Sequence, residues 1–194
     1  MSNKDILEQL DESKFVLSEL IKNNDSIDVI NSIANKFIET IRSGKKILIA
    51  GNGGSASDSQ HIAGELVGRF NYDRPGVAAF SLNTDTSIIT AIGNDYGYEN
   101  IFSRQIQAVG SSGDIFLGIS TSGTSKNIIN GFKEAKKKNM INVGFCGSKL
   151  GEFDEHCELV FRSPSKDTPK IQEIHIIVAH IICSILEKTL FPKY

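Results

Sequence analysis

The sequence predicts a three-layer α/β fold with a five-stranded, mainly parallel sheet, preceded by an N-terminal helical pair. Beyond residue 44, short β-rich runs alternate with helical stretches, which is typical of βαβ units with right-handed crossovers. Three of these runs lack polar alternation, as expected of strands covered on both faces. A length of 194 residues suits one domain. We therefore expect a single domain over residues 1–194, with its α/β core over 45–194.

The first 44 residues predict two helices, because apolar side chains recur at 3/4 spacing in two successive stretches. For the second helix, Asp25 or Ser26 is the expected N-cap and Gly44 the expected stop. The two apolar stripes consist of Ile6, Leu10, Leu17 and Leu20, and of Ile27, Ile30, Ala34, Phe37 and Ile41.

The strands and the last helix follow from the same patterns. The last helix is expected from about Pro169 to Leu190, and its apolar character extends most of the way round. We expect it to be buried by more than its own sheet, which favours an oligomer interface. The predicted strands are Lys46–Ala50, Val77–Leu82, Asp114–Ile119, Ile141–Cys146 and Leu159–Phe161.

The composition is that of an ordinary globular protein, with 40% hydrophobic and 23% charged residues and a net charge of -2. This charge predicts no nucleic-acid or anionic-membrane partner, so any anion must be held by a local site. The three cysteines lack CxxC spacing and predict buried free thiols. The first residues are polar, and the longest apolar segment, Ile176–Leu186, is too short to cross a bilayer. Cytoplasm is therefore the expected location.

A glycine-rich turn follows the first predicted strand. Gly51-Asn52-Gly53-Gly54-Ser55 leads into a helix that we expect to begin at Ala56. Glycines let the chain turn sharply and approach a ligand closely, and a helix N-terminus favours an anion. The pattern departs from the dinucleotide fingerprint GxGxxG. A ligand site and a plain tight turn both remain open readings.

A second loop, rich in hydroxyl groups, follows the third predicted strand. Ser120-Thr121-Ser122-Gly123-Thr124-Ser125 offers five hydroxyls around one glycine, and Lys126–Lys138 is predicted to be helical. Hydroxyls and converging backbone N–H groups form a phosphate cradle. The alternative is a polar loop that merely caps the helix, but one hydroxyl would suffice for a cap. The absence of a Gly-Lys-Ser/Thr motif argues against a nucleoside triphosphatase.

Three further segments carry side chains suited to proton transfer or ligand binding. His61 and Glu65 lie four residues apart and project from one helix face, as a proton relay, a metal site or a surface pair would. His180 stands in an apolar run, where a buried core histidine is the alternative. Asn94 and Asp95 follow an apolar helical stretch and also suit a helix stop.

The two loops together resemble the sugar isomerase (SIS) domain, and further motifs resemble the bacterial phosphoheptose isomerases over essentially the whole chain. This resemblance implies interconversion of sedoheptulose 7-phosphate and D-glycero-D-manno-heptose 7-phosphate by a homotetramer, whose N-terminal helical pair serves oligomerisation. The reaction is the first step toward activated heptose for lipopolysaccharide or capsule. The further motifs are Gln60-His61-Ile-Ala-Gly-Glu65-Leu, Ala91-Ile-Gly93-Asn94-Asp95-Tyr-Gly97, Phe102-Ser103-Arg104-Gln105, and Ile171-Gln172-Glu173-Ile-His175 followed by His180.

The resemblance also implies roles for individual residues. Glu65 is the expected base and His180 the expected acid, and an enediol intermediate suits a carboxylate and an imidazole. One zinc ion per subunit is expected on His61, Glu65, Gln172 and His180. The expected substrate-binding residues are Asn52, Gly53, Gly54, Ser55, Glu65, Asn94, Asp95, Ser120, Thr121, Ser122, Ser125 and Gln172.

Helix geometry adds a constraint on the implied zinc site. Gln172 and His180 are eight residues apart, which is roughly 12 Å along a helix axis. Ligands within about 2.2 Å of one ion must lie much closer together. We therefore expect the two side chains in any one site to come from different copies of the helix, so that a monomer is inactive.

The main alternative is a non-catalytic SIS-type protein that binds phosphosugars or associates with a replication initiator. Such a relative should lack the catalytic carboxylate and imidazole, whereas this chain keeps Glu65, His61 and His180. A phosphosugar-sensing regulator would need a DNA-binding segment, for which the chain offers no helix-turn-helix. One departure from the family is Lys170, preceded by Pro169, where an arginine is usual. Lysine lacks the bidentate fork of arginine.

Overall fold

A sheet of five parallel strands with the order β2-β1-β3-β4-β5 forms the middle layer of the computed structural model, which describes residues 3–193. Every neighbouring pair of strands is parallel, which confirms the predicted parallel sheet. The observed strands differ from the predicted runs by at most two residues at an end. They are β1 (Ile47–Gly51), β2 (Ala79–Ser81), β3 (Ile115–Ile119), β4 (Ile141–Cys146) and β5 (Leu159–Arg162).

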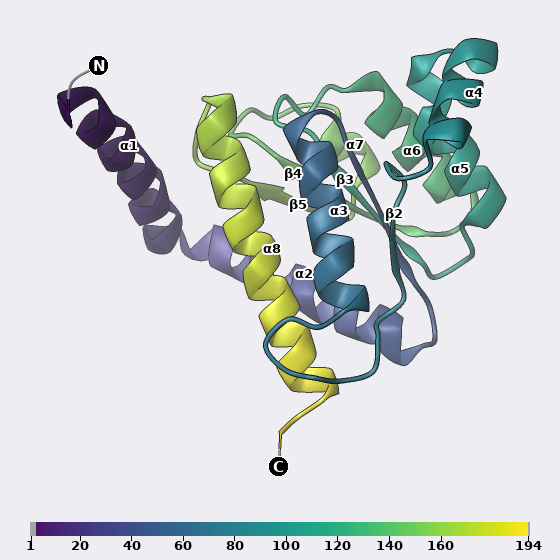
Figure 1. Cartoon of the computed structure of the whole chain (residues 1–194), viewed down its shortest axis with the longest axis horizontal. Helices are drawn as coiled ribbons and strands as arrows, with labels where there is room; N and C mark the ends of the chain where they lie inside the picture. The colour runs from purple at the N-terminus through teal and green to yellow at the C-terminus, as the bar shows by residue number, and fades with distance from the viewer. Residues whose placement is uncertain (1–2, 194) are drawn as a thin grey trace.

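Helices flank this sheet on both faces, as the three-layer prediction requires (Figure 1). One core lies between the sheet and α2, α3 and α8, and it includes Phe37, Leu66 and Val178. The second core lies between the other face and α5, α6 and α7. The helices are α1 (Asn3–Lys22), α2 (Asn24–Arg42), α3 (Gly54–Val67), α4 (Thr86–Tyr96), α5 (Ile101–Val109), α6 (Lys126–Lys137), α7 (Phe153–His156) and α8 (Thr168–Leu190), with a 3₁₀ turn η1 (Tyr98–Asn100).

The cap of α2 differs from the prediction. Asn23 is the N-cap, and its side chain accepts a hydrogen bond from the backbone N–H of Ser26, so neither Asp25 nor Ser26 has this role. The helix begins early because α1 ends only one residue before Asn23, which leaves no room for a longer connection. Gly44 follows the helix with φ 71°, a conformation that suits glycine, and so confirms the predicted stop.

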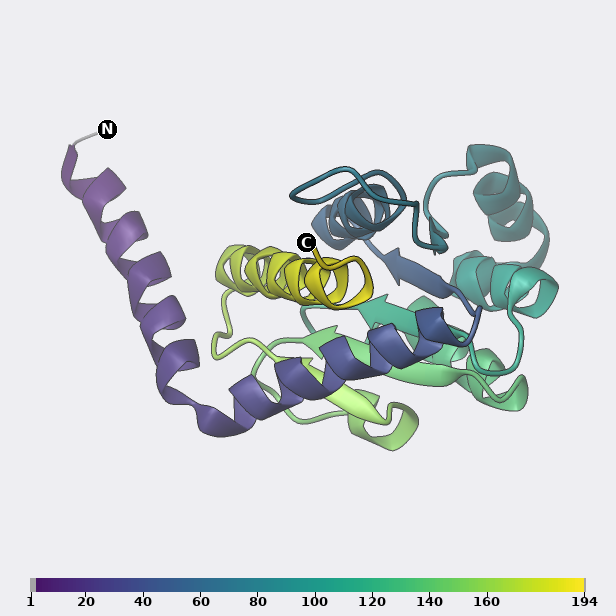
Figure 2. The same ribbon diagram turned by 90° about the horizontal axis from the view of Figure 1, so that it is seen from below.

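Helix α1 projects away from the rest of the molecule (Figure 2). Only Val16 and Leu20 are buried along it. Lys170 at the start of α8 connects α8 to α1. Its ammonium group donates to Gln9 O at 3.1 Å and to Ser13 Oγ at 2.8 Å. Several large apolar side chains of α1 remain exposed, namely Ile6, Leu7, Leu10, Phe15 and Ile21.

Helix α8 begins one residue earlier than expected and packs along α2 and α3. Two of the three cysteines, Cys146 and Cys183, are buried, and Cys157 is half-buried, so the thiols are free and largely covered as expected. Within residues 3–193, no helix combines the length and apolar character that a membrane crossing requires.

Candidate functional site

The two predicted turns lie side by side because their strands are neighbours. Strands β1 and β3 pair in parallel, with Gly51 opposite Ile119. The glycine turn and the Ser/Thr loop therefore leave the same edge of the sheet from adjacent positions. With this strand order, the crossover connections diverge between β1 and β3, which is where open α/β sheets bind ligands.

The glycine turn is held by an asparagine that the sequence patterns did not single out. The Asn83 side chain accepts from Gly51 N–H at 3.1 Å and donates to Gly51 O at 2.9 Å. Gly53 has φ 56°, and α3 begins at Gly54 rather than at the predicted Ala56. The earlier start brings the helix N-terminus closer to the strand end.

Asn52 connects this turn to helix α6 and to the 3₁₀ turn η1. Its amide exchanges two hydrogen bonds with Asn127 of α6, at 2.9 Å and 2.8 Å, and its oxygen also accepts from the Tyr98 hydroxyl at 3.1 Å. Asn127 and Tyr98 are thus site neighbours that sequence reasoning missed. The sequence gives little indication of these contacts, because an Asn in the first turn of a helix, such as Asn127, and a Tyr after a glycine, such as Tyr98, are both common.

The hydroxyls of the Ser/Thr loop converge on one another. Ser120 Oγ lies 2.8 Å from Ser125 Oγ and 3.3 Å from Ser122 Oγ, and the Thr124 hydroxyl donates to Ser122 Oγ at 3.0 Å. Ser125 is the N-cap of α6, but its side chain makes no capping hydrogen bond. The Ser125 hydroxyl therefore does not cap α6, and it lies grouped with the other hydroxyls of the loop. Thr121 lines a cavity beside Gly147 together with Ser122 and Thr124.

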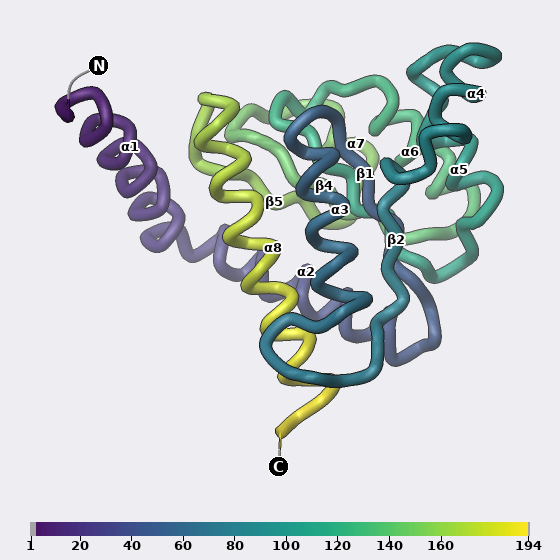
Figure 3. Tube along the Cα trace, viewed as in Figure 1, coloured from purple at the N-terminus to yellow at the C-terminus, as the bar shows by residue number. Residues whose placement is uncertain are grey.

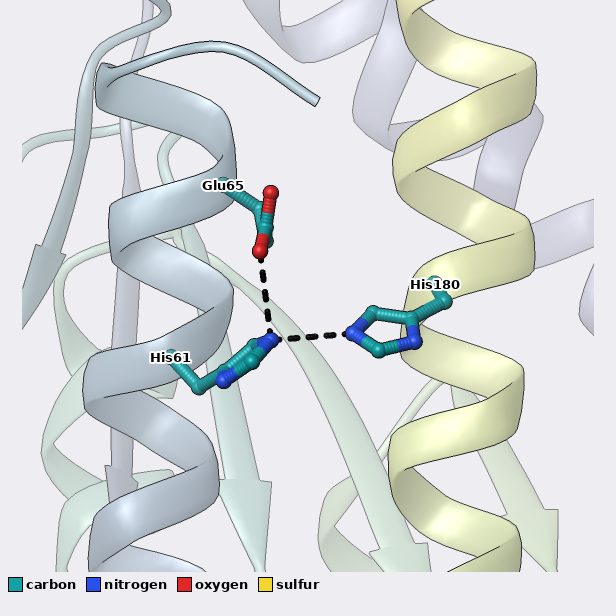
Figure 4. A group of neighbouring side chains, drawn as sticks. All are labelled: His61, Glu65 and His180. Atoms are coloured by element: carbon teal, nitrogen blue, oxygen red, sulfur yellow. Dashed lines mark hydrogen bonds and ion pairs between the residues drawn. The ribbon is translucent and has the colours of Figure 1, made fainter. Parts of the chain in front are cut away.

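A group of three side chains from α3 and α8 meets above the sheet (Figure 4). His61 Nε2 lies 3.2 Å from Glu65 Oε1 and 2.9 Å from His180 Nε2. One ligand atom from each of the three residues lies within 4.8 Å of the other two. Spacing had predicted the shared face of His61 and Glu65, and the structure brings His180 to the same point.

This junction fits a metal ion by the chemistry of its donors. His61 Nε2 carries at most one hydrogen, which would have to serve both Glu65 and His180 as acceptors. A cation binds all three lone pairs at once, and two imidazoles with one carboxylate are a usual set for a divalent transition metal. The Phe70 ring, 5.5 Å from the His180 ring centroid, covers one side.

Gln172 and the Asn94–Asp95 pair lie elsewhere. A Cβ on Gly54 would come within 2.5 Å of Gln172 Nε2, so this amide lies against the start of α3, two turns from His61. Asn94 and Asp95 are inside α4, not beyond its end, because the helix continues through Gly93 to Tyr96. The Asn94 amide donates to Asp95 Oδ1 at 2.8 Å.

Burial shapes the electrostatics around the junction. Burial raises the pKa of Asp58, one turn before His61, to about 6, although the nearby His61 opposes the shift. Cys183 lies on α8, three residues after His180. Burial raises the pKa of its thiol to about 12. Cys183 is therefore a neutral thiol near pH 7. The ligand atoms that meet at the junction are those of His61, Glu65 and His180.

Comparison with known proteins identifies the family of the chain. The SIS domain family matches residues 10–147. A phosphoheptose isomerase of Burkholderia pseudomallei (strain K96243) is 50% identical over 188 residues, covering 97% of this chain and 95% of that protein. The chain belongs to the phosphoheptose isomerase family. Phosphoheptose isomerase 2 of Campylobacter jejuni is 51% identical over 94% of this chain and 90% of its own length.

A solved structure extends the agreement to three dimensions. The phosphoheptose isomerase of Neisseria gonorrhoeae superimposes with a TM-score of 0.90 at 34% identity, covering 96% of this chain and 98% of that one. The fold is therefore the SIS fold of the phosphoheptose isomerases, N-terminal helices included. Membership identifies the chain as an isomerase and disfavours the non-catalytic alternative, whose members should lack Glu65 and His180.

Proposed function

We propose that this phosphoheptose isomerase interconverts sedoheptulose 7-phosphate and D-glycero-D-manno-heptose 7-phosphate, with Glu65 as the base and His180 as the acid. The observation that carries the proposal is the meeting of Glu65, His61 and His180 within 4.8 Å of one another. This group lies on the helix that begins at the glycine turn. The reaction would supply the first intermediate of activated-heptose synthesis for lipopolysaccharide or capsule.

The chemistry needs one proton to move between neighbouring carbons. Glu65 removes a proton from C1 of the ketose, and the C2 carbonyl becomes the enediol oxygen as His180 gives it a proton. Glu65 then returns its proton to C2, and the O1 proton passes to His180, which completes the aldose and restores both groups. His61 Nε2 lies 3.2 Å from the Glu65 carboxylate and would hold the metal beside it.

The Ser/Thr loop is the proposed phosphate grip. Ser120, Ser122 and Ser125 present grouped hydroxyls, and the start of α3 adds the N–H group of Gly54 at its positive dipole end. The Ser55 N–H already donates to Asn52 O at 3.0 Å, so Ser55 would act through the position of the turn. Thr121 is proposed to contribute beside them, since it lines the same cavity as Ser122 and Thr124. Asn52, Asn94 and Asp95 are proposed to contact the sugar hydroxyls.

Zinc is the proposed metal, held by His61, Glu65 and His180 with Gln172 from a second subunit. When bound, it would polarise the sugar carbonyl and hold the two reacting oxygens. Gln172 of the same chain lies about 12 Å along α8 from His180, so a neighbouring copy is the natural source of the fourth ligand. The exposed apolar face of α1 supports assembly, and we propose a homotetramer with sites at subunit interfaces.

A coupled assay on sedoheptulose 7-phosphate tests the proposed reaction. Wild-type protein, supplied with zinc, is expected to form the aldose product. An assembled protein that binds the sugar phosphate but forms no aldose would favour the non-catalytic binding protein instead.

Replacing Gly54 by Ala is expected to lower kcat/KM by at least tenfold with little loss of stability. The new methyl group would lie 2.5 Å from Gln172 Nε2, and the flexible amide must move away. Gly64→Ala, in the same helix, is the matched control, because a Cβ there meets nothing within 4 Å. Steady-state kinetics and thermal melts of both variants make the comparison, and equal kinetics would contradict a role for this contact.

Leu10→Glu is expected to break the assembly and reduce the specific activity by at least tenfold. Leu10 is 60% exposed in the single chain, so a charge there should affect assembly far more than folding. Gln9→Glu adds the same charge to a neighbouring polar position as a control. Sedimentation velocity measures the state of assembly. If Leu10→Glu keeps the wild-type sedimentation coefficient, α1 is not the interface.

A further inference from the structure

The loop that follows α3 is locked to the far end of α8. Residues 68–76, which we call the strap, leave the end of α3 and pass around the C-terminal part of α8 before reaching β2 (Figure 3). The strap is joined to α8 at two points, the Glu187 carboxylate and the end of the helix.

Glu187 is a fully buried carboxylate whose partners all come from the strap. Its oxygens accept from Phe70 N–H at 2.9 Å and Asn71 N–H at 2.7 Å, and the Arg74 Nε–H donates to it at 3.2 Å. Burial alone would raise the pKa of Glu187. The Asn71 and Phe70 N–H groups and the Arg74 guanidinium outweigh burial and hold the pKa below its ordinary value. The carboxylate is therefore charged at neutral pH.

Arg74 connects this carboxylate to the end of α3. Its side chain is also buried, and it donates to Glu65 O at 2.8 Å, Leu66 O at 2.6 Å and Gly68 O at 3.1 Å. These are carbonyls at the helix C-terminus, which lack partners within the helix, and a cation there is favoured by the dipole. One guanidinium thus joins the last turn of α3 to Glu187 of α8.

The joined segments carry the three side chains of the proposed site. Glu65 supplies one of the carbonyls that Arg74 binds, and His180 lies seven residues, about 10 Å, before Glu187 on α8. Phe70, held through its N–H by Glu187, places its ring 5.5 Å from the His180 ring. The strap therefore acts on both helices and touches His180 directly.

We propose that Arg74 and Glu187 are positioning residues that set the relative placement of Glu65 and His180. This proposal rests on the site proposed above. Apolar packing between α3 and α8 resists separation of the helices but tolerates small shifts along their axes. Directional hydrogen bonds to the fixed carbonyls and N–H groups resist such shifts, and a shift near 1 Å is enough to impair catalysis.

Arg74→Lys and Glu187→Gln test the proposal, with Tyr72→Phe as the control. Tyr72 belongs to the same strap, but its hydroxyl reaches Glu187 O and Phe191 O, not the carboxylate or α3. Both test variants are expected to lower kcat for sedoheptulose 7-phosphate at least tenfold while KM stays within twofold. Cobalt(II) affinity, followed by visible absorption, is expected to fall about tenfold. Tyr72→Phe should match the wild type in all three quantities.

The outcomes separate this proposal from the assignment of the site. If His180→Gln is inactive but folded Arg74→Lys keeps wild-type kcat and cobalt affinity, the positioning proposal alone is wrong. If His180→Gln keeps full activity, the site assignment is wrong and the positioning role falls with it. A rise in KM at unchanged kcat also overturns the proposal. Should Glu187→Gln not fold, Arg74→Lys decides, since it keeps a cation beside Glu187.

Discussion

Glu65→Gln and His180→Gln are each expected to lower kcat by about 10²–10⁴-fold, the usual contribution of a positioned general base or acid. Glutamine keeps the size of Glu65 but cannot accept the C1 proton, and glutamine in place of His180 removes the donor to the carbonyl oxygen. Because the proposed phosphate grip lies on another loop, KM should change much less than kcat. Stopped-time assays of aldose formation on purified variants measure both constants.

The control for these variants is Glu155→Gln, which removes an exposed carboxylate of α7. It should retain wild-type kinetics, which shows that loss of a carboxylate as such is harmless. Wild-type kcat in both Glu65→Gln and His180→Gln would refute the acid–base assignment while leaving the fold and the family membership intact.

His175 is expected to make the folded protein less stable in acid, by about 3 kcal/mol at pH 4. Burial lowers the pKa of His175 from 6.5 to about 4, although the hydrogen bond to Cys146 O opposes the shift. Nε2 is 3.1 Å from that carbonyl, and Nδ1 is buried without a partner among the described residues. Between pH 6.5 and 4 the unfolded chain therefore binds the extra proton, and stability falls as pH falls.

Urea denaturation at pH 7, 5.5 and 4.5 measures this dependence. His175→Phe should be less sensitive to pH than the wild type over this range, whatever its stability at pH 7. Phe161→Leu disturbs the same packing, because the Phe161 ring lies 6.2 Å from the imidazole, but keeps the titrating group. It should retain the wild-type acid loss. An unchanged pH dependence in His175→Phe would contradict the account.

The fold was predictable because its signals are local. Unbroken apolar runs such as Ile47–Ala50 indicate buried strands. Gly44 marks the end of a helix because glycine readily adopts the positive φ that is common just after a helix. The cap of α2 was misplaced because Asn23, Asp25 and Ser26 are all good caps, and only the end of α1 decides between them.

The site was predictable only in part. The pairing of His61 with Glu65 follows from helix spacing, whereas the approach of His180 depends on how α8 packs across α3. Asn83, Asn127 and the strap contacts of Glu187 are fixed by tertiary structure, since each joins segments more than 30 residues apart. Nothing in the local pattern around Glu187 distinguishes it from a solvated helix residue.

Because β1 and β3 are neighbours, the glycine turn and the Ser/Thr loop lie side by side, and substrate binding and proton transfer would involve different segments. The proposed grip on the phosphate belongs to the β3–α6 loop, while the proposed base and acid lie on α3 and α8, where the reacting carbons would be bound. The phosphate is the same in ketose, enediol and aldose, so in this proposal the Ser120–Ser125 loop would bind all three with similar strength. Such uniform binding lowers KM without lowering the barrier. The rate acceleration must then come from groups that interact more strongly with the charge that develops at C1 and C2 in the transition state.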